Sequence, residues 1–144
     1  HLPFVPKRYF VVYDVPTKEV RGEHAHRALH QAMVCLRGSV AVVVDDGKER
    51  DEVLLDSPET GLYVPPMIWA TQYRYSPDAM LLVLASDVYD AADYIRDYDE
   101  YLAARRRVES INTPTFDGVS GRSIQRKARS SSGIGRVMLV RSMR

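Results

Sequence analysis

The stretch SVAVVVDDGKERDEVLLD, residues 39–56, holds two short apolar runs on either side of an Asp46-Gly47 pair. Runs rich in valine are typical of β-strands, and Asp-Gly readily adopts the positive φ angles that a tight hairpin turn requires. The stretch therefore predicts two antiparallel strands, over residues 39–47 and 51–56.

Short apolar runs of the same kind lie on both sides of this hairpin. Turn residues separate the runs, which cover residues 8–14, 31–38, 61–66, 68–75 and 79–85. Repeated short strands at this spacing predict an all-β protein, either a sandwich or a barrel. A late apolar patch at residues 137–140 is expected to add an edge strand.

One helix is predicted after these strands. An apolar stripe at helical spacing is formed by Ala91, Tyr94, Ile95, Tyr98 and Leu102. Asp90 is the expected N-cap and Asp93 adds negative charge to the first turn, while the arginines at 105–107 close the other end, so both ends complement the helix dipole. We expect the stripe to pack on the barrel or on a partner subunit.

The charge distribution divides the 144 residues into a folded domain, residues 1–107, and a basic tail, residues 108–144. Residues 1–104 carry 10 basic and 17 acidic side chains, a balance of −7, whereas residues 105–144 carry 10 basic and 2 acidic ones, a balance of +8. The tail is rich in Ser, Gly and Arg and has little to bury, so we expect it to be flexible. It has almost no aromatic residues for base stacking, so we expect no nucleic-acid partner.

Cysteine content and hydropathy bear on the cellular compartment. Cys35 is the single cysteine, so a disulfide within the chain is excluded, and its apolar neighbours indicate a buried small side chain. Nothing resembles a signal peptide, and no apolar run approaches the length that crosses a bilayer. We therefore expect a cytoplasmic protein with no membrane partner. The first residue is His1 rather than Met, which indicates a fragment or a processed chain.

The stretch VRGEHAHRALHQ, residues 20–31, holds three of the four histidines. In a strand, residues i and i+2 project from the same face, so the imidazoles of His24 and His26 are expected to lie side by side. Such a pair suits a metal site, a proton-transfer site or a hydrogen-bonded polar patch.

The surrounding residues favour proton transfer over a metal. A usual metal site adds a third histidine and a carboxylate, but Gln31 stands where the carboxylate is expected, and no histidine follows residue 31. Imidazole both takes and gives a proton near neutral pH, and two adjacent imidazoles resist double protonation. Arg21 adds a positive charge that disfavours imidazolium and can hold an anionic or enolate oxygen.

Four motifs, RGEHAH, LDSP, GLYVPPMIWA and LLVLASDVYDAADYIRDYDEY, resemble in the same order the nucleotide-sugar 3,4-ketoisomerases of the WxcM-like group. The resemblance covers residues 3–103 and does not extend to 108–144. RGEHAHRALHQAMVCLRG also looks like the first cupin motif, and Ala70 stands where metal-binding cupins place a histidine in the second. The resemblance implies an all-β, cupin-type jelly-roll barrel with one C-terminal helix, a homodimer, and a site without metal or cofactor.

The resemblance also implies a reaction. The substrate would be a dTDP-4-keto-6-deoxyhexose, whose keto group moves from C4 to C3 through an enediol, in the biosynthesis of deoxyamino sugars for surface polysaccharide. His24 is the expected base and His26 would orient or relay protons, and the two roles could be exchanged. Arg21 would stabilise the enediolate or a phosphate, and Gln31 would bond sugar hydroxyls.

The strand WATQYRY adds further substrate-binding candidates, Trp69, Gln72, Tyr73 and Arg74. Strand alternation places Gln72 and Arg74 on one face and Trp69 and Tyr73 on the other, and leaves open which face lines the pocket. Members of the group usually begin with another strand carrying an Asp-Arg-Gly element, and this sequence begins after it, so a pocket wall or a dimer contact is expected to be missing. Some members carry an acetyltransferase domain, whose hexapeptide repeats the tail lacks.

Two alternatives remain open at this stage. The chain could be a catalytically silent cupin that binds a sugar nucleotide, or a metal-dependent cupin enzyme such as an oxygenase or an epimerase. The stereochemistry at C4 of the product depends on which sugar face receives the proton, and the sequence does not determine it.

Overall fold

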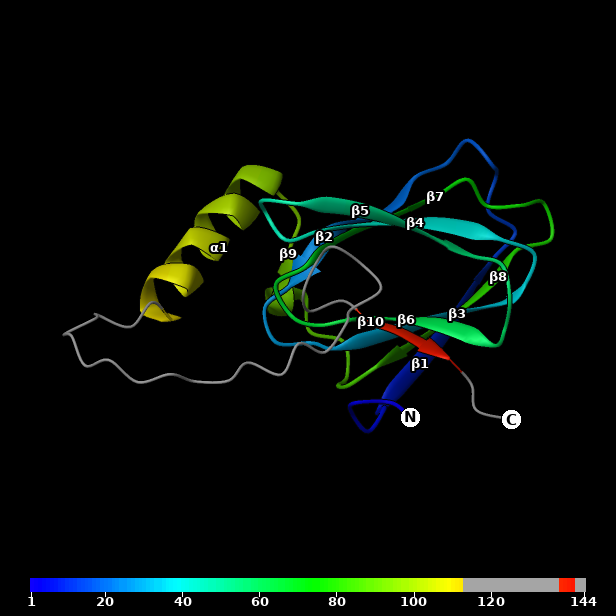
Figure 1. Cartoon of the computed structure of the whole chain (residues 1–144), viewed down its shortest axis with the longest axis horizontal. Helices are drawn as coiled ribbons and strands as arrows, with labels where there is room; N and C mark the ends of the chain where they lie inside the picture. Colours follow the sequence, from blue (N-terminus) through cyan, green and yellow to red (C-terminus); the bar gives the residue numbers. More distant parts are fainter. Residues whose placement is uncertain (113–137, 142–144) are drawn as a thin grey trace, which may run out of the picture.

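The computed structural model describes residues 1–112 and 138–141, which form two antiparallel five-stranded sheets lying face to face (Figure 1). The first sheet has the order β1 (Arg8–Tyr13), β8 (Met80–Ala85), β3 (Gln31–Arg37), β6 (Thr60–Val64) and β10 (Met138–Arg141). The second has the order β5 (Arg50–Leu55), β4 (Val40–Asp45), β7 (Trp69–Tyr73), β2 (Arg21–His26) and β9 (Tyr94–Ile95).

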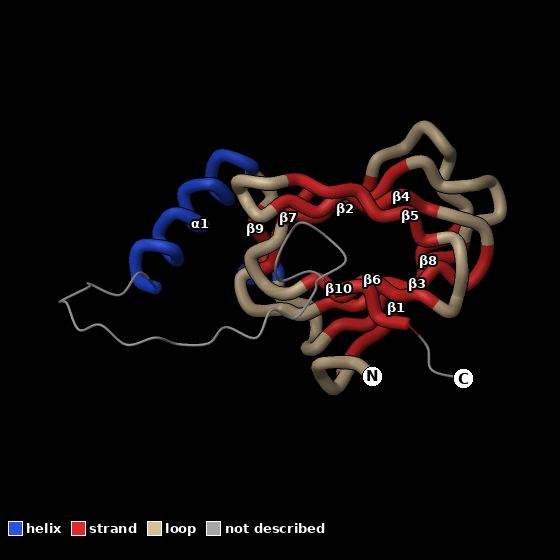
Figure 2. Tube along the Cα trace, viewed as in Figure 1, coloured by secondary structure: helices blue, strands red, loops and turns tan. Residues whose placement is uncertain are grey.

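This architecture confirms the predicted all-β jelly roll with one C-terminal helix, although the barrel is open rather than closed. Among the described residues, no strand of the first sheet is hydrogen-bonded to a strand of the second. Figure 2 shows the two layers of strands, with helix α1 outside them at one end.

The core lies between the sheets and is built from alternate residues of each strand. Its fully buried members include Val40, Val42, Val44, Leu62, Leu81 and Val83. Cys35 is buried in the same cluster, as its apolar neighbours indicated. Burial of each such aliphatic side chain contributes ~1.5–3 kcal/mol, so this layer is the main source of stability.

The hairpin predicted at Asp46-Gly47 is confirmed. β4 pairs antiparallel with β5, with Val42 opposite Val53. Gly47 has a φ angle of 89°, and the Asp46 carboxylate accepts the backbone N–H groups of Lys48 and Glu49 at 2.9 Å. The turn is therefore closed by the aspartate side chain and by the freedom of glycine at positive φ.

The predicted start of the helix is wrong. The segment that was expected to begin one helix at Asp90 forms the 3₁₀ turn η1 (Ala91–Asp93), then β9, and only then the helix α1 (Tyr98–Asn112). β9 exists because Tyr94 and Ile95 pair with His26 and Ala25 of β2, and these ladder bonds override the helical periodicity. Asp90 caps η1 instead, by accepting the N–H of Ala92 at 2.9 Å.

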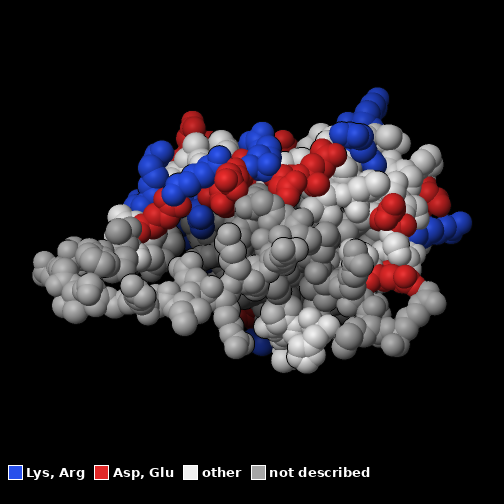
Figure 3. Space-filling model, in the orientation of Figure 1, with Lys and Arg blue, Asp and Glu red and all other residues white. Residues whose placement is uncertain are grey.

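Helix α1 packs on the barrel, which was one of the two predicted positions. The Tyr101 hydroxyl, fully buried, donates to the backbone oxygens of Asp45 at 2.7 Å and Met67 at 3.1 Å. The ring of Tyr101 lies 5.5 Å from that of Trp69. Figure 3 shows basic and acidic side chains mixed over the outer side of the helix and the adjoining sheet, where Lys48 pairs with Glu109 at 3.1 Å.

The predicted tail, residues 108–144, falls largely outside the described residues. The helix was expected to close at the arginines 105–107, but it continues to Asn112. The late edge strand is confirmed, since β10 pairs antiparallel with β6. In the described part of the chain, no helix combines the length and the apolar character that spanning a bilayer requires.

Replacing Tyr101 by Phe is expected to lower the free energy of unfolding by about 1–2 kcal/mol, because two buried carbonyl oxygens lose their donor. Urea denaturation measures this change. Tyr89→Phe is the control, since Tyr89 is 57% exposed. Equal effects of the two substitutions would contradict the anchoring role of the Tyr101 hydroxyl.

Candidate functional site

A pocket of about 340 Å³ opens between the two sheets and is lined by residues of β1, β2, β3, β7, β8 and β9. It brings together four of the side chains that the sequence singled out, namely Arg21, His24, Gln31 and Gln72. The remaining lining residues were not anticipated as site residues: Phe10, Val12, Gly22, Val83, Tyr94 and Arg96.

A bulge in β2 directs His24 toward this pocket. The register with β7 shifts between Gly22 and His24, and Gly22 has a φ angle of 83°. A Cβ atom at Gly22 would lie 2.8 Å from the carbonyl oxygen of Ala70, so the bulge requires glycine for both its conformation and its space.

The bulge also determines which nitrogen of His24 is free. The Nδ1 atom of His24 lies 2.8 Å from the carbonyl oxygen of Gly22. A carbonyl oxygen only accepts, so Nδ1 carries the hydrogen and Nε2 keeps its lone pair. The ring therefore presents a basic nitrogen on the side away from the strand.

His26 lies directly beside His24, as the spacing predicted. The ring centroids are 4.9 Å apart and the rings are nearly perpendicular, at 88°. His26 is only 5% exposed and its Nδ1 lies 2.9 Å from Oδ2 of Asp93. The pair thus has one member on the pocket wall and one behind it.

Tyr94 completes an aromatic cluster with the two histidines. Its ring centroid lies 4.8 Å from that of His24 and 4.3 Å from that of His26, and the Arg96 guanidinium carbon lies 4.2 Å from the Tyr94 ring centroid. Sequence reasoning missed Tyr94 and Arg96 because it placed them in a helix. Tyr94 and Ile95, which precede Arg96, are residue types that favour β-strands. Only the pairing of these two residues with β2 reveals that Tyr94 contacts the histidines.

Both imidazoles are held neutral near pH 7. Burial is the largest cause that lowers the pKa of His24, with the charge of Arg96 adding to it, while the bond to Gly22 opposes the shift. Burial likewise lowers the pKa of His26 to about 4, with further lowering by His24 and Arg8, against the opposing effect of Asp93. Arg21 was expected to disfavour imidazolium, but Arg8 and Arg96 take that role.

Arg21, Gln31 and Gln72 line the pocket in different ways. Arg21 is exposed and its guanidinium lies 3.3 Å from the carboxylate of Glu19, so its charge sits at the solvent side. Gln31 and Gln72 are buried polar side chains, 5% and 8% exposed. The Gln72 amide oxygen accepts the Tyr75 hydroxyl at 2.8 Å, which fixes the orientation of that amide.

Three predicted substrate-binding residues, Trp69, Tyr73 and Arg74, lie outside this pocket. Alternation along β7 places Trp69 and Tyr73 on the outer face of the second sheet, where they line a separate hollow of about 440 Å³ together with Tyr98. Arg74 follows the end of β7 with a φ angle of 50°, so alternation does not extend to it. Its guanidinium lies instead over Tyr73 and pairs with Glu52 at 3.5 Å.

The arrangement suits the removal of a proton from carbon next to a carbonyl group. Two neutral imidazoles with unprotonated Nε2 atoms can accept a proton, and buried amides can bond hydroxyl groups. Arginine charge beside the rings can stabilise a developing oxyanion. Within residues 1–112 and 138–141, no group of three or more His, Cys, Asp or Glu side chains could hold a metal ion.

Comparison with known proteins gives consistent matches. The family described as FdtA, WxcM-like, C-terminal, matches residues 1–106. A TDP-4-oxo-6-deoxy-alpha-D-glucose-3,4-oxoisomerase of Aneurinibacillus thermoaerophilus is 48% identical over 112 residues, which are 78% of this chain and 78% of the relative.

Solved structures agree with the sequence matches. The sugar 3,4-ketoisomerase QdtA of Thermoanaerobacterium thermosaccharolyticum, in complex with TDP, superposes with a TM-score of 0.73 at 37% identity, over 74% of this chain and 78% of that one. WlaRA, a TDP-fucose-3,4-ketoisomerase of Campylobacter jejuni, gives a TM-score of 0.72 at 36% identity, over 74% and 79% of the two chains.

Replacing His26 by Gln is expected to change how stability depends on pH. The pKa of His26 in the folded protein, about 4, lies below the ordinary value of 6.5, so the unfolded chain binds more protons at this residue between these pH values. Lowering the pH through that window destabilises the wild type at His26 but not the variant. The free energy of unfolding of the wild type minus that of the variant therefore falls from pH 6.5 to pH 4 in urea titrations. A difference that stays constant would contradict the lowered pKa.

Proposed function

The chain belongs to the WxcM-like, C-terminal family described as FdtA, and from this membership we propose that it is a 3,4-ketoisomerase acting on a dTDP-4-keto-6-deoxyhexose. The observation that carries the proposal is the pair of adjacent, neutral imidazoles at the pocket, His24 half-buried and His26 buried, with Nε2 of His24 free to act as a base. Proton transfer at two adjacent sugar carbons needs this chemistry and no redox step.

The reaction is an internal exchange of hydrogen. A base removes the proton from C3, the electron pair forms a C3–C4 double bond, and the C4 carbonyl oxygen becomes a hydroxyl, so an enediol results. The C3 hydroxyl then loses its proton, C3 becomes the carbonyl, and C4 takes up a proton. Atoms and electrons balance without a cofactor.

We assign His24 as the base, because it lines the pocket while His26 lies behind it. A base must be unprotonated at the working pH, and the lowered pKa of His24 meets this condition at pH 7. His26 relays protons at the same site. Arg96, beside His24, is placed to stabilise the negative charge of the enediolate.

The polar lining supports a bound substrate whose hexose lies deep in the pocket and whose nucleotide lies at the solvent side. Gln31 and Gln72 are buried and suit the hydroxyl groups of the hexose. Arg21 is exposed at the solvent side and suits a phosphate of the nucleotide, since arginine binds phosphate oxygens in a bidentate manner. We leave Trp69, Tyr73 and Arg74 out of the substrate site.

We propose a cytoplasmic enzyme that acts without a metal ion. The histidine pair has Gln31 and Ala70 where a metal site would supply a carboxylate and a histidine, and neither is a good ligand for a transition metal. The product is a 3-keto sugar, which is the kind of carbonyl compound that an aminotransferase converts into a 3-amino sugar.

We also propose that the enzyme is a homodimer, and the outer face of the first sheet supports this. Side chains opposite to the core are apolar across three neighbouring strands, where they comprise Tyr9, Val11, Tyr13, Met80, Leu82, Leu84, Val34 and Leu36. Tyr9 is 73% exposed, Tyr13 61% and Leu36 43%, and the charged Arg37 lies at the end of β3, in register with Met80. A continuous apolar sheet face of this kind marks an association surface.

Incubation with dTDP-4-keto-6-deoxyglucose in deuterated water is expected to yield a 3-keto product that carries solvent deuterium, as observed by NMR. His24→Asn is expected to lower turnover by about 10²–10⁴-fold while the protein stays folded and still binds dTDP. His30→Asn is the matched control, because His30 bonds the Tyr63 hydroxyl outside the pocket.

Absence of both product and deuterium in the wild type, with dTDP still bound, would favour the catalytically silent alternative. Loss of turnover after dialysis against EDTA, restored by an added transition metal, would favour the metal-dependent one. Near-native turnover of His24→Asn would overturn the assignment of the base.

Replacing Tyr9 by Glu is expected to convert the dimer to monomer in sedimentation velocity, because a charge would be buried in the apolar contact. Leu54→Glu, at a 58% exposed position on the second sheet, is the control and should stay dimeric. The opposite pattern would place the contact on the second sheet.

A further inference from the structure

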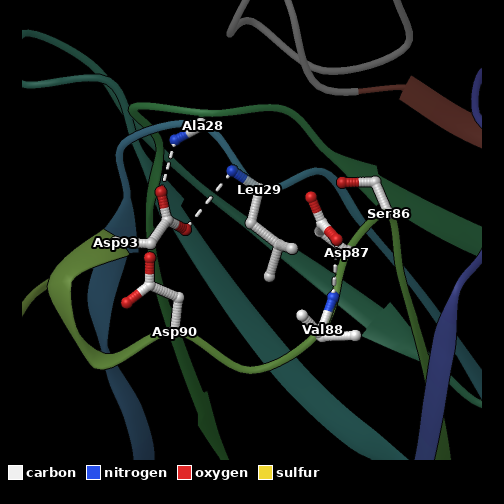
Figure 4. A pocket seen from close by; sticks show the side chains of 7 residues that line it. All are labelled: Ala28, Leu29, Ser86, Asp87, Val88, Asp90 and Asp93. Carbon is white, nitrogen blue, oxygen red and sulfur yellow. Dashed lines mark hydrogen bonds between the residues drawn. The ribbon is translucent and has the colours of Figure 1, made fainter.

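The Asp93 carboxylate is more extensively bonded than its place in a short surface turn suggests. Its Oδ1 accepts the backbone N–H of Ala28 at 2.7 Å, and its Oδ2 accepts that of Leu29 at 3.3 Å as well as the Nδ1–H of His26 at 2.9 Å. Figure 4 shows the Asp93 carboxylate directed at the amide groups of Ala28 and Leu29. The side chain is 15% exposed.

We propose that Asp93 is a positioning residue for the isomerisation, which holds His26 in the tautomer and the orientation that leave its Nε2 available for proton relay. This inference rests on the proposed function. It concerns a residue that bonds His26 and does not itself line the pocket.

The tautomer follows from the chemistry of the bond. A carboxylate only accepts, so the hydrogen between Asp93 and His26 belongs to Nδ1, and Nε2 keeps its lone pair. The Nε2 atom is buried and has no hydrogen-bond partner in the described part of the chain. A buried polar atom without a partner is costly, and here the bond to Asp93 holds the ring in that position.

The orientation of the His26 ring is rigid because Asp93 is held by hydrogen bonds to both its side chain and its backbone. Its two oxygens are bound to the backbone of residues 28 and 29, and its own carbonyl oxygen accepts the N–H of Arg27 at 2.9 Å. Asp90 caps the turn that carries it, by accepting the N–H of Ala92. The carboxylate therefore has little freedom to follow a rotation of the imidazole ring.

Asp93 also supplies the negative charge that opposes the positive groups around His26. His24 and Arg8 both disfavour imidazolium at this ring, whereas the hydrogen bond and the charge of Asp93 favour it. The Asp93 carboxylate therefore stabilises a proton that reaches Nε2 of His26 during the relay. Among the described residues, the hydrogen-bond partner of His24 is the neutral carbonyl of Gly22, so the two imidazoles are supported differently.

Asp93→Asn tests the proposal. The amide group can offer N–H to Nδ1, which would place the hydrogen of His26 on Nε2 and block the relay. We expect kcat to fall by about 10²-fold or more, because the wrong tautomer of His26 slows proton transfer. KM and dTDP affinity should change little, because substrate binding does not depend on that tautomer. Asp87→Asn is the matched control, because Asp87 and Asp93 both line a second cavity, of about 220 Å³, while the Asp87 carboxylate bonds Lys7 and the N–H of Val88 and does not contact His26 among the described residues.

A second measurement does not depend on the variant's folding. Nitrogen-15 NMR of the histidine rings in the wild type at pH 7 is expected to show His26 protonated at Nδ1, and in folded Asp93→Asn protonated at Nε2. Near-native kcat in a folded Asp93→Asn protein, or an Nε2–H tautomer of His26 in the wild type, would overturn the proposal. If the wild type failed to isomerise the sugar nucleotide, the proposed function would fall while the tautomer remained measurable.

Discussion

The hydrogen-bonded position of β2, between β7 on one side and β9 on the other, is the constraint on which the site depends. Pairing with β7 forces the bulge at Gly22, and the bulge provides the carbonyl that orients His24. Pairing with β9 brings Tyr94 against both imidazoles and places Asp93 at the edge of the strand, within reach of His26. The positions of His24 and His26 thus depend on the pairing of one short strand with two neighbours.

The cost of this arrangement explains the chemistry it supports. Burying two imidazoles without enough hydrogen-bond partners disfavours their charged forms, and Arg8 and Arg96 disfavour them further. Neutral rings are what a base near pH 7 requires, so the same burial that weakens the fold at low pH prepares the site for proton removal. Burial of the aliphatic side chains of β4 and β8, in the core between the sheets, stabilises the fold and offsets this cost.

Prediction from the sequence succeeded where a property is local. The Asp46-Gly47 turn, the alternating strands and the adjacent imidazoles of His24 and His26 all follow from residue type and a period of two. It failed at residues 90–97, where an apolar stripe at helical spacing became η1, β9 and a loop. Ladder bonds to β2 outweighed a weak helical preference there, and with the helix misplaced, the contacts of Tyr94, Arg96 and Asp93 with the histidine pair were hidden.

The sequence by itself determined the all-β class, the hairpin, the edge strand near residue 138 and the adjacent imidazoles of His24 and His26. Each of these features depends on side chains that are close together in the chain. Only the tertiary structure decided which face of β7 lines the pocket, removing Trp69 and Tyr73 from it and retaining Gln72. It also decided which charges act on the histidines, since Arg8 and Asp93 lie far from them in sequence. Electrostatic and hydrogen-bond partners are set by distance in space, and that distance is known only after the sheets have packed.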